Sequence, residues 1–398
     1  MKMSVHEGKR KLEGLPYGKL GVISLSGCES LCKQVDRYLV DWRTERKSEH
    51  QGSLAYEGYQ RNTYMIDSAI TRFGTGEAKG VIGQSVRGMD LYLLVDVCNY
   101  SISYRMGGHK NYMSPDDHYQ DLKRIIGARG GRARRVTVIM PFLYEGRRLT
   151  RESRESLDCA LALQELVRMG VDNILTFDAH DARVQNAIPL SGFDTVRPAY
   201  QFMKGLLCNV KSLNIDSDHM MIISPDESGM HRAIYLANVL GLDLGTFYKK
   251  KDYNRLIDGK NPIISHVFLG SSVKGKDCIV VDDMISSGET ALDVARELKR
   301  MQAGRIYLMA TFGLFTKGLE EFDKAHRDGL ITKILTTNCI YQPQELLNRE
   351  YYISCDMSKY IAFIIDTLNH DSSISDLLNP INRIQSLVKR YRDGEDLD

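Results

Sequence analysis

The sequence predicts an α/β fold in which mostly parallel strands are flanked by helices, and three observations support it. The chain has 398 residues, which corresponds to two or three domains of about 100–200 residues each. Short apolar runs rich in β-branched residues are followed by stretches with helical spacing, as in repeated β–α units. Three of these runs are followed by an aspartate, namely Asp178, Asp226 and Asp282. Because parallel strands of an open sheet end at one edge, we expect ligands to bind there.

Composition limits the possible partners. Hydrophobic residues make up 43% of the chain, charged residues 26%, and the formal net charge is +2, so neither nucleic acid nor a membrane surface is predicted as a partner. No apolar run reaches the roughly 18 residues of a membrane span, and the N-terminus lacks the apolar core of a secretory signal. Several cysteines, such as Cys159, Cys208 and Cys278, lie in apolar stretches, which indicates buried thiols. We therefore expect a reducing, cytoplasmic setting.

The N-terminal half is predicted to hold a series of strands and helices separated by polar segments. The predicted strands are Val22–Leu25, Leu91–Val95, Val136–Met140 and Ile174–Phe177. The predicted helices are Glu29–Trp42, Tyr119–Ile126 and Ser156–Met169. Cys28 and Cys32 are spaced like a metal or redox pair, but two thiols on one helix face are the simpler interpretation. The polar segments Arg43–Arg61 and Asn99–Asp116 are interpreted as an insertion and a long loop.

The C-terminal half continues the same alternation. The predicted strands are Met220–Ile223, Cys278–Val281, Ile306–Ala310 and Ile334–Thr336. One helix is expected from about Gly229 to Leu240, and another follows Thr290 and ends near Gly304. Phe193–Met203 is interpreted as a crossing segment between the halves, and Asn379–Asp398 as a polar tail whose helix frays.

The stretch from Asp277 to Thr290 carries the strongest functional signal. A buried strand is followed by Asp282 and Asp283, then by a small polar loop and a helix N-terminus. Unpaired backbone N–H groups at the start of a helix bind phosphate, and the loop hydroxyls add donors. The aspartates suit the hydroxyls of a sugar or a metal-bound water. The stretch therefore predicts a sugar-phosphate site, with a plain βα turn and solvated acids as the alternative.

This order of residue types resembles the ribose-phosphate motif of type I phosphoribosyltransferases and of phosphoribosyl pyrophosphate synthetases. The segments RFGTGE at Arg72–Glu77 and VRGMDLY at Val86–Tyr92 resemble an element that only the synthetases have. The resemblance runs from about Ser24 to Leu378. It implies two type I phosphoribosyltransferase-like domains, each a mostly parallel sheet flanked by helices. The implied division is residues 1–190 on the ATP side, residues 191–345 with the ribose 5-phosphate site and the flap, and a segment 346–398 that packs back on the N-terminal domain and ends in the polar tail.

The resemblance also implies which residues bind ATP. Phe73 and Glu77 would contact the adenine, often that of a neighbouring subunit, although a lone Phe73 would otherwise be interpreted as a core aromatic. Arg147 and Arg148 in PFLYEGRR would hold the nucleotide, and Arg148 stands where the family has glutamine. His180, in the segment DAH, would hold the Mg²⁺ that accompanies ATP, whereas a histidine without such a context is more often structural.

In the second half, Asp226 within SPDESGMHRA would be the second metal ligand and a ribose contact. The residues implied for ribose 5-phosphate are Asp226, Asp282, Asp283, Ser286, Ser287, Gly288, Glu289 and Thr290. Lys249 matches the catalytic lysine of a flap, followed by the polar loop Asp252–Pro262. Lys251 stands where the family has arginine, so it keeps the charge but loses the bidentate fork. Solvated surface lysines are the alternative interpretation.

The implied reaction converts ATP and ribose 5-phosphate into AMP and phosphoribosyl pyrophosphate, with Mg²⁺ as cofactor. The resemblance also implies a homo-oligomer that is built from dimers, such as a hexamer. Two alternatives stay open. One is a phosphoribosyltransferase, which has no need of the ATP element. The other is a non-catalytic regulatory relative, favoured by the departures from the family pattern at Thr75, Arg148, Lys251, Ser286 and Phe312. The retained Lys249, His180, Asp226, Asp282 and Asp283 favour activity.

Overall fold

The computed structural model describes residues 14–46, 56, 58–147, 151, 154–251 and 263–397, with the side chains of 249–251 and 263–266 left out. The chain divides into two compact units, and each is treated by itself. Unit 1 consists of Met1–Arg197, Cys339–Tyr341 and Asp356–Asn379. Unit 2 consists of Pro198–Asn338, Gln342–Cys355 and Pro380–Asp398.

Unit 1 is built on a five-stranded sheet in the order β1-β4-β7-β8-β9, and every pair of neighbours is parallel. Its strands are β1 (Lys19–Ser24), β4 (Met89–Leu94), β7 (Arg135–Ile139), β8 (Asn173–Phe177) and β9 (Gly192–Val196). All six residues of β4 are buried, as expected for a parallel strand with both faces covered. β9 corrects one expectation, because part of the predicted crossing segment is the fifth strand of this sheet.

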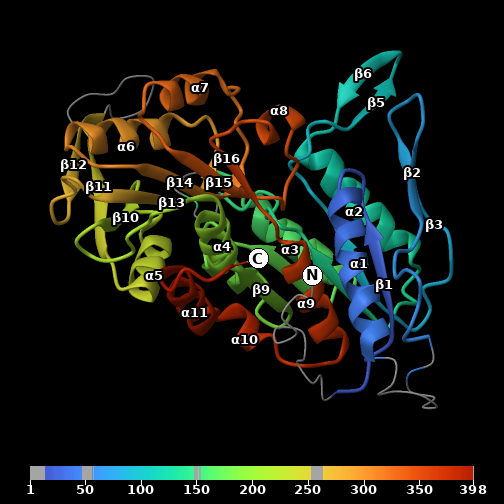
Figure 1. Ribbon diagram of the computed structural model, residues 1–398. Helices are drawn as coiled ribbons and strands as arrows, with labels where there is room; N and C mark the ends of the chain where they lie inside the picture. The colour runs from blue at the N-terminus through green and yellow to red at the C-terminus, as the bar shows by residue number, and fades with distance from the viewer. Residues whose placement is uncertain are drawn as a thin grey trace. The chain divides into compact units, whose positions relative to one another are not determined.

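Helices cover the sheet of unit 1 (Figure 1). They are α1 (Glu29–Glu45), α2 (Pro115–Ala128), α3 (Asp158–Arg168), the 3₁₀ helix Ala182–Ala187, α9 (Ser358–Asn369) and α10 (Ser375–Leu378). α2 begins four residues before its predicted start because Ser114 forms a capping box: its Oγ accepts a hydrogen bond from the N–H of Asp117 at 3.2 Å, and its own N–H donates to the Asp117 carboxylate at 3.0 Å.

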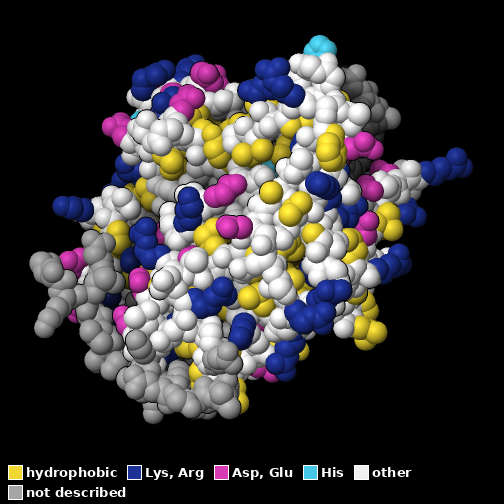
Figure 2. Space-filling view, turned by 90° about the vertical axis from the view of Figure 1, so that its right-hand side faces the viewer, with side chains coloured by type: hydrophobic (Ala, Val, Ile, Leu, Met, Phe, Trp, Pro, Cys, Tyr) yellow, Lys and Arg dark blue, Asp and Glu magenta, His cyan; other side chains and the backbone are white. Residues whose placement is uncertain are grey.

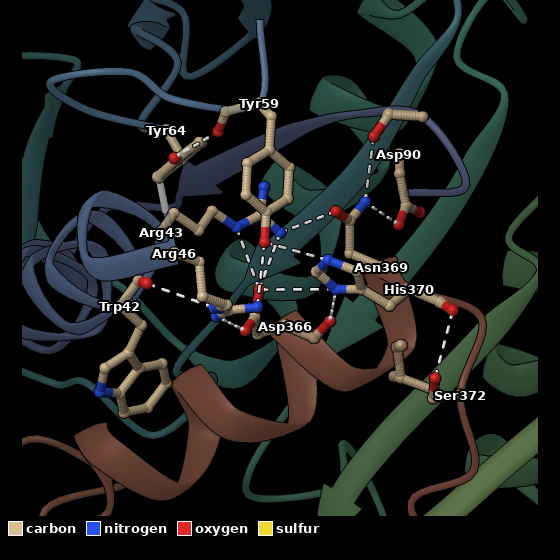
Figure 3. A network of polar contacts seen from close by, with 12 residues as sticks. Trp42, Arg43, Arg46, Tyr59, Tyr64, Asp90, Asp366, Asn369, His370 and Ser372 are labelled. Carbon is tan, nitrogen blue, oxygen red and sulfur yellow. Dashed lines mark hydrogen bonds and ion pairs between the residues drawn. The ribbon is translucent and has the colours of Figure 1, made fainter. Parts of the chain in front are cut away.

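A polar network fixes α9 to the end of α1 in unit 1 (Figure 3). Arg43 and Arg46 reach Asp366 of α9, and Tyr59 and His370 complete the group. Arg43, at the start of the segment interpreted as a polar insertion, is only 1% exposed. That segment therefore begins inside the core of unit 1 and not on its surface.

Unit 1 also has two small antiparallel hairpins, which lie beside each other at the right of Figure 1. The first pairs β2 (Ser68–Arg72) with β3 (Ala78–Ile82), and the second pairs β5 (Ser103–Met106) with β6 (His109–Tyr112). The second hairpin corrects the expectation of a loop at Asn99–Asp116. Gly107 and Gly108 form its turn with φ of 55° and 82°, the left-handed backbone that two-residue hairpin turns require.

Unit 2 is built on a seven-stranded sheet in the order β12-β11-β10-β13-β14-β15-β16. Its strands are β10 (Met220–Ser224), β11 (Asp243–Lys251), β12 (Ile263–Leu269), β13 (Asp277–Ile285), β14 (Ile306–Gly313), β15 (Lys333–Thr337) and β16 (Tyr352–Cys355). The edge strand β12 is antiparallel to β11, and the other pairs are parallel. β13 runs four residues past the predicted end, so Asp282 and Asp283 lie on the strand and not after it.

The helices of unit 2 pack on both faces of this sheet (Figure 1). They are α4 (Ala199–Asn209), α5 (Met230–Leu240), α6 (Glu289–Arg300), α7 (Glu320–Arg327), α8 (Gln344–Leu347) and α11 (Ile381–Arg392). α11 is not a fraying polar helix: Ile384, Leu387 and Val388 are buried in the core that α4 and α5 share. Among the described helices, none combines the length and the hydropathy that crossing a bilayer requires.

Candidate active site

Three aspartates lie at the carboxyl edge of the sheet in unit 2. β10 and β13 are parallel neighbours, with Ile223 opposite Val280. The end of β13 and the residues after β10 therefore bring Asp282, Asp283 and Asp226 to the same edge. The charge of Asp226 is close enough to act on the pKa of Asp282. Sequence reasoning placed these acids together, and the structure does the same.

The electrostatics of this cluster favour the uptake of a ligand. Burial raises the pKa of Asp282 well above its usual range, and the negative charges of Asp283 and Asp226 raise it further. The guanidinium of Arg232 on α5 lies 3.7 Å from Asp283, and the two side chains are only 4% and 6% exposed. This cation does not offset the burial and the like charges at Asp282. A cation or hydroxyl donors would stabilise the ionised carboxylates.

Asp226 is held by a turn that leads into α5. Its Oδ1 accepts hydrogen bonds from the N–H of Ser228 at 3.0 Å, from the Ser228 hydroxyl at 2.5 Å and from the N–H of Gly229 at 3.3 Å. Such a turn fixes a carboxylate at a helix start. Ser228, which replaces a glycine of the resembled motif, therefore helps to orient Asp226.

The loop after β13 has the geometry of an anion cradle. α6 begins at Glu289, and its first N–H groups have no intrahelical partner and face outward from the helix end. Gly288 precedes the helix with φ of 88°, and a Cβ atom there would lie 2.2 Å from the ring of Phe322. Only glycine fits this position. The loop is further fixed because Thr316 N–H donates to Ser286 O at 2.9 Å and Leu314 N–H donates to Ile285 O at 2.8 Å.

An acid stands within this cradle and is paired with a lysine. Glu289 lies at the first position of α6 and forms an ion pair with Lys317 from the segment after β14. The lysine lowers the pKa of the Glu289 carboxyl. The pair therefore limits the repulsion that an acid would exert on a bound phosphate.

The two predicted catalytic lysines are residues of strand β11, and only their backbone is described. Lys249 pairs with His266 and Lys251 with Ile263, with a register shift between Lys250 and Lys251. The strand therefore includes the lysines, which were expected to follow it. The predicted flap loop 252–262 lies outside the described residues, as do the side chains of both lysines.

In unit 1, the carboxyl edge of the sheet carries two of the predicted ATP residues. β7 and β8 are parallel neighbours, so the segments that follow them, with Arg147 and His180, leave the sheet at the same edge. Arg147 is exposed and His180 is half-buried, while Arg148 lies outside the described residues. Asp178, next to this edge, has φ of 42°, a strained backbone that is often retained at functional sites.

The other two predicted ATP residues, Phe73 and Glu77, are on the loop that joins β2 to β3. Phe73 N–H donates to Glu77 O at 2.8 Å, and Gly76 N–H donates to Phe73 O at 2.9 Å, so the loop is a tight turn. The Phe73 side chain is 46% exposed. The interpretation as a core aromatic is therefore wrong, and the ring is accessible for stacking.

The donor set fits Mg²⁺ in part. Across the described residues, no group of three or more His, Cys, Asp or Glu side chains is arranged to hold a metal by itself. Mg²⁺ commonly uses one or two carboxylates together with substrate phosphates and water. Asp226 at the acidic edge suits such a site, whereas the imidazole of His180 is a poorer ligand for a cation that prefers oxygen.

Two residues of the site were not assigned from sequence. Arg232 lies inside the quoted motif SPDESGMHRA, six residues after Asp226, so its spacing on α5 could have indicated it. Lys317 pairs with Glu289, which lies 28 positions earlier in the chain, and no local sequence pattern predicts such a contact.

These features define a class of protein. A mostly parallel sheet with an acid pair on a central strand, followed by a small polar loop and a helix start, is the arrangement of a phosphoribosyltransferase-like unit, and a second α/β unit accompanies it. The predicted fold class is confirmed.

The comparisons with known proteins agree with this class. The chain matches the N-terminal domain of ribose phosphate pyrophosphokinase over residues 20–170 and the phosphoribosyl synthetase-associated domain over residues 250–379. The ribose-phosphate pyrophosphokinase of Vibrio parahaemolyticus is 26% identical over 317 residues, which cover 79% of this chain and 91% of that protein. A putative ribose-phosphate pyrophosphokinase of Streptococcus mutans is 28% identical over 286 residues, or 71% and 78% of the two chains.

A solved structure supports the same fold. The phosphoribosylpyrophosphate synthetase of Mycobacterium smegmatis superposes with a TM-score of 0.69 at 20% identity, over 89% of this chain and 100% of that one. The chain belongs to the ribose-phosphate pyrophosphokinase family.

Proposed function

We propose that this protein transfers the β,γ-diphosphoryl group of ATP to the anomeric hydroxyl of ribose 5-phosphate, giving phosphoribosyl pyrophosphate and AMP. The observation that carries the proposal is the acid pair of half-buried Asp282 and buried Asp283 on β13, which stands directly before the loop and the start of α6, in a chain that also has the exposed Phe73 loop. The relatives named ribose-phosphate pyrophosphokinase support it.

The sugar phosphate would bind in unit 2. Its phosphate would accept hydrogen bonds from the backbone at Gly288–Thr290 and from the hydroxyls of Ser286, Ser287 and Thr290, each worth roughly 1.5–3 kcal/mol with a charged oxygen. The ribose hydroxyls would lie against Asp282 and Asp283. Because the cradle and the acid pair follow each other on one strand and helix, the ring would be anchored at both ends.

Charge on the reacting phosphates would be balanced by lysines and a metal. Lys249 and Lys251 would supply positive charge from the flap, and Asp226 and His180 would hold Mg²⁺. The metal would neutralise negative charge on the triphosphate when bound. The chain's own contribution is mainly positioning and electrostatic stabilisation, as is usual in phosphoryl transfer.

ATP would bind to residues of unit 1. The exposed ring of Phe73 would stack on the adenine, Glu77 would accept hydrogen bonds from it, and the guanidinium groups of Arg147 and Arg148 would hold the phosphates. We propose that the protein forms a homo-oligomer, in which this loop can serve the ATP site of a neighbouring copy.

A reducing, cytoplasmic setting fits the thiols. The eight cysteines are thiols and not disulfides, and six of them are buried, namely Cys28, Cys32, Cys159, Cys278, Cys339 and Cys355. Cys208 is exposed, so the expectation of a buried thiol is wrong at that position. Disulfides are expected in oxidising compartments, so a cytoplasmic enzyme is the simplest proposal.

A coupled assay of AMP release with Mg²⁺, ATP and ribose 5-phosphate tests the proposal. AMP formation that requires both substrates supports the diphosphokinase. Binding of ATP and ribose 5-phosphate without AMP would favour the regulatory relative, which the departures at Thr75 and Phe312 suggest. Consumption of phosphoribosyl pyrophosphate with a base, and no AMP from ATP, would favour the phosphoribosyltransferase.

A further inference from the structure

The β5–β6 hairpin contacts the loop that carries Phe73 and Glu77. Gly107 N–H, at the tip of the hairpin, donates to Gly74 O at 3.0 Å. Beside it, a Cβ atom added at Gly76 would lie 2.6 Å from the Sδ of Met106, so this side chain packs directly on the loop. A backbone hydrogen bond and a side-chain contact therefore join the hairpin tip to the loop.

The base of the same hairpin is joined to β2 and α2 through Arg72, the residue just before Phe73. The Arg72 guanidinium lies over the Tyr104 ring at 4.4 Å and donates to Asp121 at 2.7 Å. The Tyr104 hydroxyl donates to Asp117 at 3.2 Å. The side chains of Arg72 and Asp121 are 12% and 5% exposed, so their ion pair is largely shielded from solvent, and the contacts of Arg72 and Asp117 with Tyr104 hold the hairpin in place.

Several side chains of the loop and of the β5–β6 hairpin are exposed. Figure 2 looks onto the side on which both hairpins lie in Figure 1, and hydrophobic side chains are visible there between charged ones. Phe73, Met106 and Tyr112 are 46%, 41% and 60% exposed. A short exposed turn would sample several conformations unless a neighbour fixed it, and ordering its residues on binding would cost conformational entropy.

We propose that the β5–β6 hairpin is a positioning element for nucleotide binding, which holds the Phe73–Glu77 loop in its binding conformation before ATP arrives. Tyr104 and Met106 are the positioning residues, and neither needs to touch the nucleotide. Preorganisation raises affinity because the ordering cost is met before binding. The inference rests on the proposed function, since that function assigns Phe73 and Glu77 to ATP.

The test compares Tyr104→Leu with Tyr112→Leu. Both tyrosines belong to the hairpin, but Tyr112 lies on β6 and contacts Lys110 instead of the Arg72 network. Hydrogen exchange is measured on the backbone amides of residues 73–77, and kcat and KM are measured for both substrates. Met106→Ser, a change at an exposed position, is a second variant that leaves the Arg72 network intact.

We expect Tyr104→Leu to speed exchange at residues 73–77 and to raise KM for ATP about tenfold, which corresponds to about 1.4 kcal/mol. KM for ribose 5-phosphate and kcat stay within twofold. Met106→Ser gives a smaller change in the same direction, and Tyr112→Leu gives none. Unchanged exchange in Tyr104→Leu and Met106→Ser, or faster exchange with an unchanged KM for ATP, overturns the inference.

Failure of the proposed function has a different signature. The wild-type protein would then form no AMP, while the exchange measurement would still show whether the hairpin orders the loop. In that case the dissociation constant of ATP, measured by calorimetry, replaces KM. An equal affinity in wild type and Tyr104→Leu again overturns the inference.

Discussion

Each unit of the molecule contains buried carboxylates, and their surroundings differ. In unit 1, Asp366 accepts hydrogen bonds from Arg43 Nε at 3.0 Å and Nη2 at 2.9 Å, and it forms a second ion pair with Arg46 (Figure 3). Burial acts to raise the pKa of Asp366, but the two arginines outweigh it, and this pKa is lowered. In unit 2, burial and like charges raise the pKa of Asp282.

The opposite pKa shifts of Asp366 and Asp282 distinguish a carboxylate that stabilises the fold from one that is available to a ligand. A buried carboxylate that is fully paired contributes to the structure only while its partner is present, because an uncompensated buried charge costs several kcal/mol. A carboxylate at the carboxyl edge of a sheet whose pKa is raised by like charges as well as by burial stores an unfavourable interaction that a ligand can relieve. We therefore assign Asp366 to stability and Asp282 to binding, and the predictions below test this assignment from each side.

The largest effect is expected in unit 1. Arg43→Met should lower the free energy of unfolding by about 3–5 kcal/mol, because Asp366 would lose its main buried partner. Arg37→Met, at an exposed position of α1, is the control and should change it by less than about 0.5 kcal/mol. Chemical denaturation followed by circular dichroism measures both. Equal stability of the two variants would contradict the structural role of the network.

The same network makes a prediction about pH. Burial lowers the pKa of His370 to about 4, and the neutral ring donates from Nδ1 to Asp366 O at 2.6 Å and accepts at Nε2 from the Tyr59 hydroxyl at 3.1 Å. Between the unfolded value of about 6.5 and this folded value, the unfolded chain binds the proton and the folded chain does not. The contribution of His370 is therefore present above about pH 6.5 and is lost as pH falls toward 4.

A variant isolates this contribution from other groups. Asp96, whose pKa burial raises to about 7, acts in the opposite direction, because its folded state holds a proton that the unfolded state releases. The free energy of unfolding is measured for wild type and His370→Leu at each pH. Because Asp96 is present in both proteins, its contribution cancels in the difference between them. This difference in the free energy of unfolding should narrow by on the order of 3 kcal/mol between pH 7 and pH 4.5. A difference independent of pH would show that His370 is not buried in its neutral form.

A third prediction concerns the flap. Lys249→Ala should keep the melting temperature and lose at least about a hundredfold in turnover, the scale of one lost transition-state donor. Lys274→Ala, an exposed lysine of the same unit, should keep both. Near-normal turnover in Lys249→Ala would remove this lysine from the chemistry.

The smallest effect is expected for Asp282→Asn, which tests whether Asp282 serves ligand binding. Asp282→Asn removes a half-buried carboxyl that faces two other acids, so the melting temperature should stay equal or rise, in contrast to Arg43→Met. Affinity for ribose 5-phosphate should fall at least about tenfold, since a hydrogen bond to a charged group is worth about 1.5–3 kcal/mol. Calorimetry and thermal melting measure the two quantities. A large loss of stability with unchanged affinity for ribose 5-phosphate would show that Asp282, like Asp366, stabilises the fold and does not bind the ligand.

The comparison also explains what sequence could predict. The strands and the strand–loop–helix arrangement at Asp277–Thr290 can be predicted because they follow from local order: β-branched runs, then Asp282, then small polar residues and a helix start. The ion pair Arg43–Asp366 joins residues 323 positions apart, and no periodicity marks it. Arg43 was assigned to a polar insertion because an arginine is rarely buried unless a partner is known.

Two other features escaped prediction for similar reasons. The β5–β6 hairpin was interpreted as a loop because its strands are short and mostly exposed, so they lack the apolar alternation of a half-buried strand. Helix α11 was interpreted as a fraying tail, since its partners Val210 and Leu213, which bond to Tyr391, lie far away in the sequence.

The most direct test of the account is the identity of the product. Phosphorus NMR of the wild-type protein with Mg²⁺, ATP and ribose 5-phosphate should show AMP and a pyrophosphoryl group on the anomeric carbon in equal amounts, and Asp282→Asn should form both more slowly at low ribose 5-phosphate. Release of ADP, or an unchanged ATP spectrum after prolonged incubation, would contradict the proposed reaction.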